Sequence, residues 1–317
     1  TYTIGGTTPD FTNFTDVAAA LNNAGVGCPV VFNVRDGVYN EQIKLYDILG
    51  SSAINTITFQ GESADSSLAA LHYQTSNTSN DFTLALEGTG NIFFRDMGIK
   101  RTTGTYAMLI QNGSHNVTVD NCQLGHVISP NTSTDSVLTF RNNNATGVNI
   151  DLQHVNGENS GTQIIEGNYV GGIVVTDASS VSIKNNGISN PSGYALDFTV
   201  NRSDNVVIEN NRFRKLSCSS DSLMQINSNS IYENRSQYGA TFIGVNISTC
   251  YATTLTSNTI TSRNTFGAAN NWLTAVRAVF VSSSSSIKLD SNTIDAYCGG
   301  STNGGSNNYG VRISGTS

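Results

Sequence analysis

One short pattern recurs along most of the chain and constrains its fold more than any other feature. The pattern has apolar residues at its first and sixth positions, Asn, Ser or Asp at the third and most often Asn at the fourth. Its core is constant while the spacing between copies varies, which predicts fixed strands joined by loops of different length. A closed globular core would not repeat in this way. The copies begin at Phe94, Val119, Ile150 (a degenerate copy), Ile183, Ile208, Leu255 and Leu289, and residues 226–231 also fit.

A second set of short apolar segments precedes most copies. Two or three strands in each coil of about 25 residues or more are typical of a parallel β-helix. We therefore predict an all-β fold, a single-stranded right-handed parallel β-helix (solenoid) with an N-terminal capping α-helix. Residues 1–317 are expected to form one domain, with a cap over 1–27 and stacked coils over 28–317 that continue beyond Ser317. The second set comprises 84–86, 108–110, 137–140, 173–175, 196–199, 242–245, 278–281 and 311–313.

The fourth pattern position predicts a structural ladder. Equivalent strands of neighbouring coils pair at about 4.8 Å, so equivalent side chains stack. We expect the asparagines at this position to point inward and to bond one another from coil to coil. Ligand binding by these side chains is the alternative. The ladder comprises Asn186, Asn211, Asn258 and Asn292, and it should weaken where Met97, Cys122 and Gln153 take the same position.

The ends of the chain carry separate signals. Phe14, Val17, Ala18 and Leu21 have the spacing of one helical face, which predicts a capping helix over about 13–24. Thr12 or Asn13 can serve as its N-cap, and Gly25 can end it. At the other end, residues 309–313 resemble the first strand of another coil. The expected partner there is the remainder of a longer polypeptide or another β-helix coil.

Composition excludes several classes of function. Only 12% of residues are charged and the net charge is −7, without the basic face of a nucleic-acid binder, although a local basic pocket stays open. No apolar stretch approaches the 18 residues of a membrane span. The five cysteines lack zinc-site spacing, so no metal or cofactor is expected apart from Ca²⁺ at a carboxylate pair. A disulfide among Cys218, Cys250 and Cys298 is left open.

The first 60 residues resemble a known group. Residues 2–6, 9–11 and 31–43 are similar to the start of pectin-lyase-like β-helix domains, most of all those of large bacterial surface proteins exported by type IX secretion. This resemblance implies a secreted cell-surface location, a multidomain parent and often no assigned activity. Pectin methylesterases share a similar opening and the Gly37, Tyr39 and Glu41 segment, which serves as scaffold. The signatures of pectate lyases and polygalacturonases are not found.

The second pattern position predicts a column of charged side chains. Arg95, Asp120, Asp151, Lys184 and Glu209 occupy it in successive copies. Asp120 and Asp151 would then lie about 5 Å apart, close to the separation in retaining glycosidases and suited to sharing Ca²⁺. Lys184 or Arg95 could act as a lyase base or a carboxylate clamp. The alternative is a solvated ladder of alternating charges.

Two further groups are candidates for chemistry. His126 and His154 follow the pattern in consecutive copies, and Tyr106 could lie near them, as in a lyase; capping of turns is the alternative. Long loops leave from one side and carry Trp272, with Tyr232 and Tyr297 in or beside them. Such aromatic side chains could stack on sugar rings or simply pack the loops onto the coils.

These observations favour a noncatalytic structural or adhesive β-helix module of a larger secreted cell-surface protein, in contact with polysaccharide. One alternative is a polysaccharide lyase or glycoside hydrolase that acts on an acidic polysaccharide. The other is a carbohydrate-binding module that uses the loop face. The distinguishing observations are further coils or adhesion repeats after Ser317 and product formation on uronans.

Overall fold

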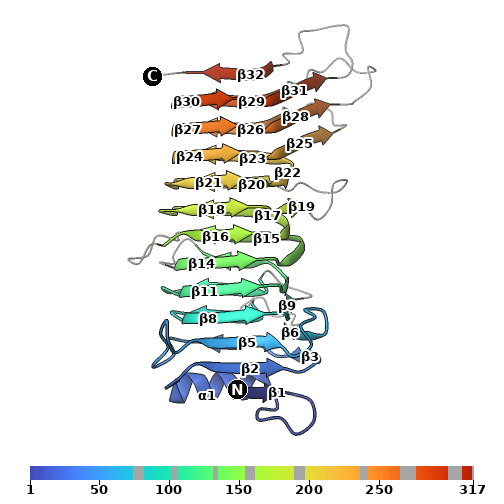
Figure 1. The fold of residues 1–317 in the computed structure, drawn as a ribbon, viewed down its shortest axis with the longest axis vertical. Coiled ribbons are helices and arrows are strands. Elements are labelled where there is room, and N and C mark those ends of the chain that lie inside the picture. The colour runs from blue at the N-terminus through green and yellow to red at the C-terminus, as the bar shows by residue number, and fades with distance from the viewer. Residues whose placement is uncertain are drawn as a thin grey trace. The chain divides into compact units, whose positions relative to one another are not determined.

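The computed structural model describes residues 1–73, 82–101, 106–130, 135–153, 161–188, 197–235, 242–264, 276–298 and 309–315. The chain divides into two compact units, Thr1–Ser179 (unit 1) and Ser180–Ser317 (unit 2). Within each unit the strands pair in parallel and stack in chain order, as Figure 1 shows. The predicted right-handed parallel β-helix is confirmed, whereas the assignment of a single domain stays a prediction. Among the described residues, no helix has the length and hydropathy required to cross a membrane.

Unit 1 begins with the predicted cap. Helix α1 (Phe14–Ala24) starts after Asn13, whose side chain accepts a 2.8 Å hydrogen bond from the Asp16 N–H. It ends at Gly25, which has a φ of 69° and donates its N–H to the Leu21 carbonyl. The four residues of the predicted apolar face are buried. The predicted boundaries of the helix are therefore confirmed to within one residue.

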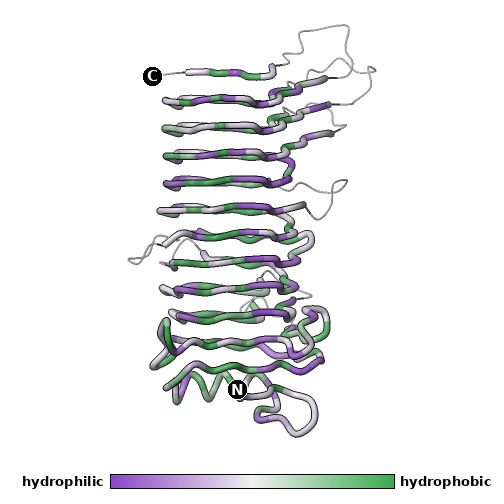
Figure 2. Tube along the Cα trace, viewed as in Figure 1, coloured by the Kyte–Doolittle hydropathy of each residue, from purple (hydrophilic) through white to green (hydrophobic). Residues whose placement is uncertain are grey.

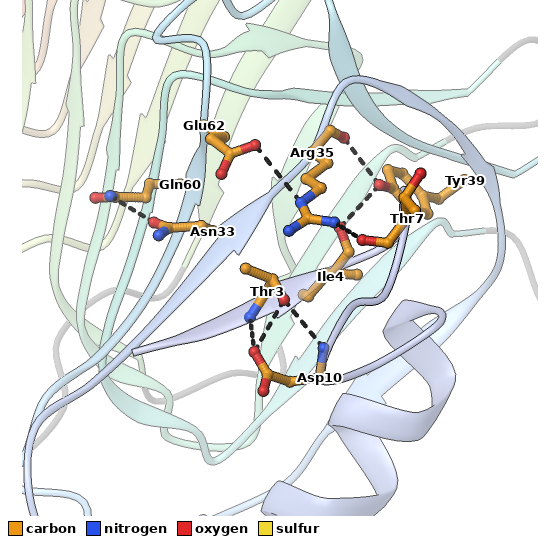
Figure 3. Close-up of polar contacts among 9 residues, drawn as sticks. All are labelled: Thr3, Ile4, Thr7, Asp10, Asn33, Arg35, Tyr39, Gln60 and Glu62. Carbon is orange, nitrogen blue, oxygen red and sulfur yellow. Dashed lines mark hydrogen bonds and ion pairs between the residues drawn. The ribbon is translucent and has the colours of Figure 1, made fainter.

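Tyr39 and Glu41 join the cap to the first coil. The Tyr39 hydroxyl lies 3.0 Å from the Ile4 carbonyl and 2.8 Å from the Arg35 carbonyl (Figure 3). The Glu41 carboxylate accepts the Phe14 N–H at 3.0 Å and an N–H of the next residue, at the positive end of the helix. Both side chains thus serve the scaffold.

Two groups of strands build unit 1. Phe32, Phe59 and Phe94 stack in one buried file, with ring centroids 5.0 and 5.4 Å apart. The first sheet runs in the order β1 (Tyr2–Ile4), β2 (Val30–Val34), β5 (Ile57–Gly61), β8 (Gly90–Arg95), β11 (His115–Asp120), β14 (Ser136–Arg141), β16 (Gln163–Glu166). The second group comprises β3 (Gly37–Asn40), β6 (Ala69–Tyr73), β9 (Gly98–Arg101), β12 (Gln123–Leu124), β15 (Asn144–Gln153) and β17 (Tyr169–Thr176), with β4 (Ile43–Leu45), β7 (Leu84–Glu87), β10 (Met108–Gln111) and β13 (Val127–Ser129) beside them.

Unit 2 has three sides. Its first sheet contains β18 (Val181–Lys184), β21 (Val206–Glu209), β24 (Ser222–Asn227), β27 (Tyr251–Thr256) and β30 (Ser285–Asp290). Its second contains β20 (Asp197–Asn201), β23 (Lys215–Ser219), β26 (Phe242–Ser248), β29 (Val276–Ser282) and β32 (Tyr309–Ser314). Its third contains β22 (Arg212–Phe213), β25 (Ser230–Arg235), β28 (Thr259–Asn264) and β31 (Thr293–Cys298), and β19 (Gly187–Ile188) is a further short strand.

The predicted stacking of like residues is confirmed in unit 2. Ile183, Ile208, Ile226, Leu255 and Leu289 pair in this order along the first sheet. The first four are buried, and Leu289 in the last strand is half-buried. Figure 2 shows the corresponding alternation of apolar and polar residues along the strands. Residues 226–231 therefore belong to an additional coil between those of Ile208 and Leu255.

The backbone conformation at the third pattern position explains why Asn, Ser and Asp are preferred there. It adopts a left-handed backbone at Asn185, Asn210, Ser228, Ser257 and Ser291, with φ between 53° and 56°. This conformation is disfavoured for most residues and tolerated by short polar ones. It turns the chain at each corner and directs the next side chain inward.

The asparagine ladder is present in unit 2 and has one rung more than expected. Asn186 donates its side-chain N–H to Asn211 Oδ1, Asn211 to Asn229, Asn229 to Asn258 and Asn258 to Asn292, at 2.9–3.0 Å. In each case the backbone N–H of the donor residue also points at the same oxygen. Asn229 is the additional rung.

The assignment of a degenerate copy of the pattern to residues starting at Ile150 was wrong. The next two coils begin at Phe140, which pairs with Val119 in the first sheet, and at Ile165, which pairs with Phe140, whereas Ile150 lies in β15 of the second group. The ladder position is filled by Asn143 and Asn168, not by Gln153, and the Cys122 N–H donates to Asn143 Oδ1 at 2.9 Å. The pattern is harder to recognise in these two coils. The copy that begins at Phe140 ends in the small residue Ala145, and the copy that begins at Ile165 has Gly167 at its third position.

The cysteines of unit 2 are not joined in the described structure. Cys218 and Cys250 are buried free thiols, and burial raises the pKa of each. The side chain of Cys298 lies outside the described residues. In unit 1, Cys122 is buried in the file of the asparagine ladder, as a small apolar side chain would be.

Candidate functional site

The predicted column of charges exists in unit 1 with different members. Asp120 pairs with Arg95 on one side and Arg141 on the other, and Arg141 pairs with Glu166. The Arg141 Nε to Glu166 Oε2 distance is 3.6 Å, and both side chains are about 40% exposed or more. Exposed pairs of this kind contribute under about 1 kcal/mol each. The column is an alternating, solvated ladder.

Asp151 does not belong to this column. It lies in β15 of the second group, opposite Ile128 and Val174, because the next coil after Val119 begins at Phe140 and places Arg141 at the column position. The predicted carboxylate pair of Asp120 and Asp151, and with it the shared Ca²⁺, was therefore wrong. Among the residues that the structure describes, no group of three His, Cys, Asp or Glu side chains could hold a metal ion.

In unit 2, Lys184 and Glu209 are neighbours as predicted. They pair between β18 and β21, and Lys184 Nζ lies 2.9 Å from Glu209 Oε2. Each side chain is more than one third exposed, so the pair is solvated. The next positions along the column are Asn227, Thr256 and Asp290, of which only Asp290 is ionisable.

In unit 1, His126 directly precedes β13, and Asp151 on β15 lies opposite Ile128 of that strand. The His126 ring lies 5.2 Å from the Tyr106 ring, between centroids, as the sequence suggested. Burial raises the pKa of Asp151, and a 3.0 Å hydrogen bond from Gln153 and the nearby His126 charge oppose that rise. An imidazole, a phenol and a partly buried carboxyl group are thus gathered on one face. His154 lies outside the described residues.

The two predicted tyrosines share the outer face of the third sheet in unit 2. Tyr232 on β25 is 47% exposed and Tyr297 on β31 is 53% exposed. Tyr232 pairs with Thr261, which pairs with Asp295, and Arg263 on β28 pairs with Tyr297. We call Tyr232, Arg263, Asp295 and Tyr297 the tyrosine face. Trp272, the third predicted contact, lies outside the described residues.

An ion pair holds the centre of the tyrosine face. Arg263 Nε donates to Asp295 Oδ2 at 2.9 Å, and Nη2 of the same guanidinium also contacts that oxygen. This hydrogen bond raises the pKa of Arg263, and Tyr232 and Tyr297 contribute in the same direction. Arg263 and Asp295 could not be identified from the repeated pattern, because their proximity depends on strand pairing across 32 residues.

An ionic cluster around the buried Glu233 lies on the inner side of the same sheet. Glu233, 3% exposed, is the residue after Tyr232 and faces inward with Ile231. Its Oε2 lies 2.9 Å from Arg214 Nε, and Arg214 Nη2 lies 2.8 Å from Asp197 Oδ1. Burial raises the pKa of Glu233 to about 7, while Arg214 opposes the rise. The sequence does carry a signal for this cluster: Glu233 occupies an inward position of a strand whose inward neighbour is the apolar Ile231.

A second corner of unit 2 also carries a polar ladder that the sequence analysis missed. Asp221 is buried and accepts the Ser203 N–H at 2.8 Å, and the Cys250 N–H donates to Ser284 Oγ at 3.0 Å. Burial raises the pKa of Asp221 to about 7. These groups close the corner and are structural.

Comparisons with known proteins concern the fold. No protein-family model matches the chain, and no curated protein matches its sequence. Among solved structures, pectin methylesterase from carrot is similar over 98% of this chain and 86% of its own, with 10% identity and a TM-score of 0.29. The Aspergillus niger pectin methylesterase is similar over 99% and 85%, with 12% identity and a TM-score of 0.34. Tailspike protein 3 of bacteriophage CBA120 is similar over 89% and 56%, with 11% identity and a TM-score of 0.34. At these values the likenesses carry no information about activity.

Proposed function

We propose that this chain is a polysaccharide-contacting β-helix module of a secreted cell-surface protein. Its sugar-binding surface is the tyrosine face of unit 2. The observation that carries the proposal is the pair of half-exposed rings, Tyr232 and Tyr297, on either side of the Arg263–Asp295 ion pair. The role is one of adhesion or structure rather than of turnover.

The chemistry of the tyrosine face suits a sugar. A tyrosine ring offers an apolar face for the C–H groups of a sugar and a hydroxyl for its polar edge. Arg263 and Asp295 add donors and acceptors for sugar hydroxyls. The strands β25 and β31 are two strand spacings apart, about 10 Å, which exceeds one sugar ring. Side chains held on paired strands also lose less conformational freedom on binding than side chains on loops.

Replacement of either tyrosine by alanine is expected to weaken polysaccharide binding about tenfold, because each ring supplies one stacking contact. The measurement is affinity electrophoresis, followed by calorimetry, with soluble β-glucan, xylan and mannan. Tyr251→Ala is the matched control, since Tyr251 on β27 is equally exposed at 57% but belongs to the first sheet. Equal losses for Tyr251→Ala and Tyr232→Ala, or no binding to any of these polymers, would contradict the proposal.

The partner at β32 is part of the same proposal. Val311 and Ile313 continue the core files of Val279 and Val281, yet they are 38% and 58% exposed. Apolar side chains in core register are stabilised when another layer covers them. We infer that a further coil or another part of a longer polypeptide covers this strand.

A second candidate function is acid–base catalysis on an acidic polysaccharide, favoured by the placement of Asp151 opposite β13, which follows His126, and by the contact of His126 with Tyr106. An imidazole beside a carboxyl group can abstract and return a proton. If the group is catalytic, His126→Ala should abolish the ultraviolet-absorbing product formed from alginate or pectate, and Asp151→Asn should lower its rate at least 100-fold. Asp120→Asn, outside the group, should leave the rate unchanged. A wild-type chain without activity on either polymer excludes this candidate.

A further inference from the structure

The outer face of the second sheet in unit 2 carries two arginines from adjacent strands. Arg277 on β29 pairs with Tyr309 on β32, and Phe280 pairs with Arg312. The alternation of β29 breaks at Ala278 and the following residue, which are both buried. Arg277 and Phe280 therefore project on the same side of the sheet, together with Arg312.

The two guanidinium groups are held on aromatic rings. The Arg277 Cζ lies 4.8 Å from the centroid of Phe280, and the Arg312 Cζ lies 5.9 Å from the same centroid. Arg312 also lies 5.4 Å from the centroid of Tyr309. Such cation–π contacts orient a guanidinium without using its N–H groups. The N–H groups of both guanidinium groups therefore stay available to another acceptor.

That acceptor is not among the residues that the structure describes. Neither Arg277 nor Arg312 forms a hydrogen bond or an ion pair within them, and the Nε of Arg277 is buried without an acceptor. By contrast, Arg214 and Arg263 are both paired with carboxylates. A buried donor without a partner is costly, and two like charges on one ring repel each other. An oxyanion bound between them would remove both costs.

We propose that Arg277 and Arg312 form a binding site for the oxyanion of an acidic sugar. A carboxylate accepts two parallel N–H bonds from a guanidinium, and a sulfate ester presents similar oxygens. The exposed ring of Tyr309 lies beside the pair and offers a surface for the sugar ring that carries the charge. The site lies on a different sheet from the tyrosine face. It rests on the proposed function only in that the ligand is a polysaccharide.

The test is calorimetric titration at low salt with a hexamer of galacturonic acid and with the same hexamer after methyl esterification of its carboxylates. The acid is expected to bind at least tenfold more tightly than the ester, and added salt should weaken its binding. Arg277→Gln and Arg312→Gln should each remove this preference. Arg277→Lys should retain only part of the preference for the acid, because an ammonium group lacks the planar pair of N–H donors of a guanidinium. Lys288→Gln, which removes an exposed cation on β30, is the matched control.

The outcomes separate the alternatives. A sulfated oligosaccharide that binds with the same dependence on both arginines would assign the oxyanion to a sulfate ester, and binding of the uronate alone would assign it to a carboxylate. Equal affinity for the acid and the ester, an equal loss in Lys288→Gln, or equal binding of inorganic sulfate would overturn the proposal. Tyr232→Ala should keep the preference for the acid, so failure of the tyrosine face is distinguishable from failure of this site.

Discussion

Replacement of Asn229 by alanine is expected to lower the free energy of unfolding of unit 2 by about 3–4 kcal/mol. The Asn229 side chain is 1% exposed. Its Oδ1 accepts the backbone and side-chain N–H groups of Asn211, and its Nδ2 donates to the Ile208 carbonyl and to Asn258 Oδ1. Alanine would leave buried donors and acceptors on both neighbouring coils without partners, in a space too polar to collapse.

The matched control for this change is Asn227→Ala. Asn227 lies two residues earlier, on the half-exposed outer side of β24, so its loss should cost within about 0.5 kcal/mol. Urea unfolding followed by far-ultraviolet circular dichroism and by the fluorescence of Trp272, the only tryptophan of the chain, measures both variants. Equal destabilisation by the two changes would show that the ladder adds nothing beyond the backbone pairing.

Arg214→Met is the second change with a large expected effect, a loss of about 3 kcal/mol at pH 8. Arg214 contacts both Glu233 and Asp197, and Glu233 is almost fully buried. At pH 8 the variant would leave the Glu233 carboxylate in the interior without its counter-charge. The double variant Arg214→Met, Glu233→Gln should recover most of the loss.

The effect of pH on this cluster has a definite sign. Burial raises the pKa of Glu233 from its ordinary 4.5 to about 7, so between these values the folded state holds a proton that the unfolded state has released. Its contribution to stability is therefore complete below about pH 4.5 and is lost as pH rises towards 7. Without Arg214, protonation is favoured further, and the Arg214→Met loss should be smaller at pH 5 than at pH 8. Urea unfolding at both values measures it, and an equal loss would contradict this account.

The sequence predicted the parts of the fold that depend on local rules. The corner needs a left-handed residue followed by an inward Asn, and the pairs Asn185–Asn186 and Asn210–Asn211 satisfy both requirements. The cap is equally local, because its apolar face and N-cap lie within one helix. Where the corner uses Gly167, as before Asn168, the same geometry is met by another residue and the pattern no longer matches.

The sites were harder to predict because they depend on the count of coils. The coil after Val119 begins at Phe140, which the pattern did not identify, so Asp151 falls on β15, on another side of unit 1 from Asp120. On β15, Asp151 pairs with Ile128, two residues after His126, and the repeated pattern had not linked these two side chains.

Side-chain pairs between strands that are separated by long loops could not be predicted from the repeated pattern. Arg277 and Arg312 are 35 positions apart in the chain, and they meet on Phe280 only because β29 and β32 pair in one particular register. Tyr232 and Tyr297 were selected because they lie in or beside long loops, without the ion pair between them. Side-chain proximity between coils follows from loop length and register, which vary from coil to coil.

The most direct test of the proposed function is a crystal structure of the full chain with a β-glucan hexasaccharide. The account predicts a sugar ring stacked on Tyr232 or Tyr297, with hydroxyl groups bonded to Arg263 or Asp295. A hexasaccharide bound away from the third sheet of unit 2, with both tyrosine rings uncovered, would contradict it.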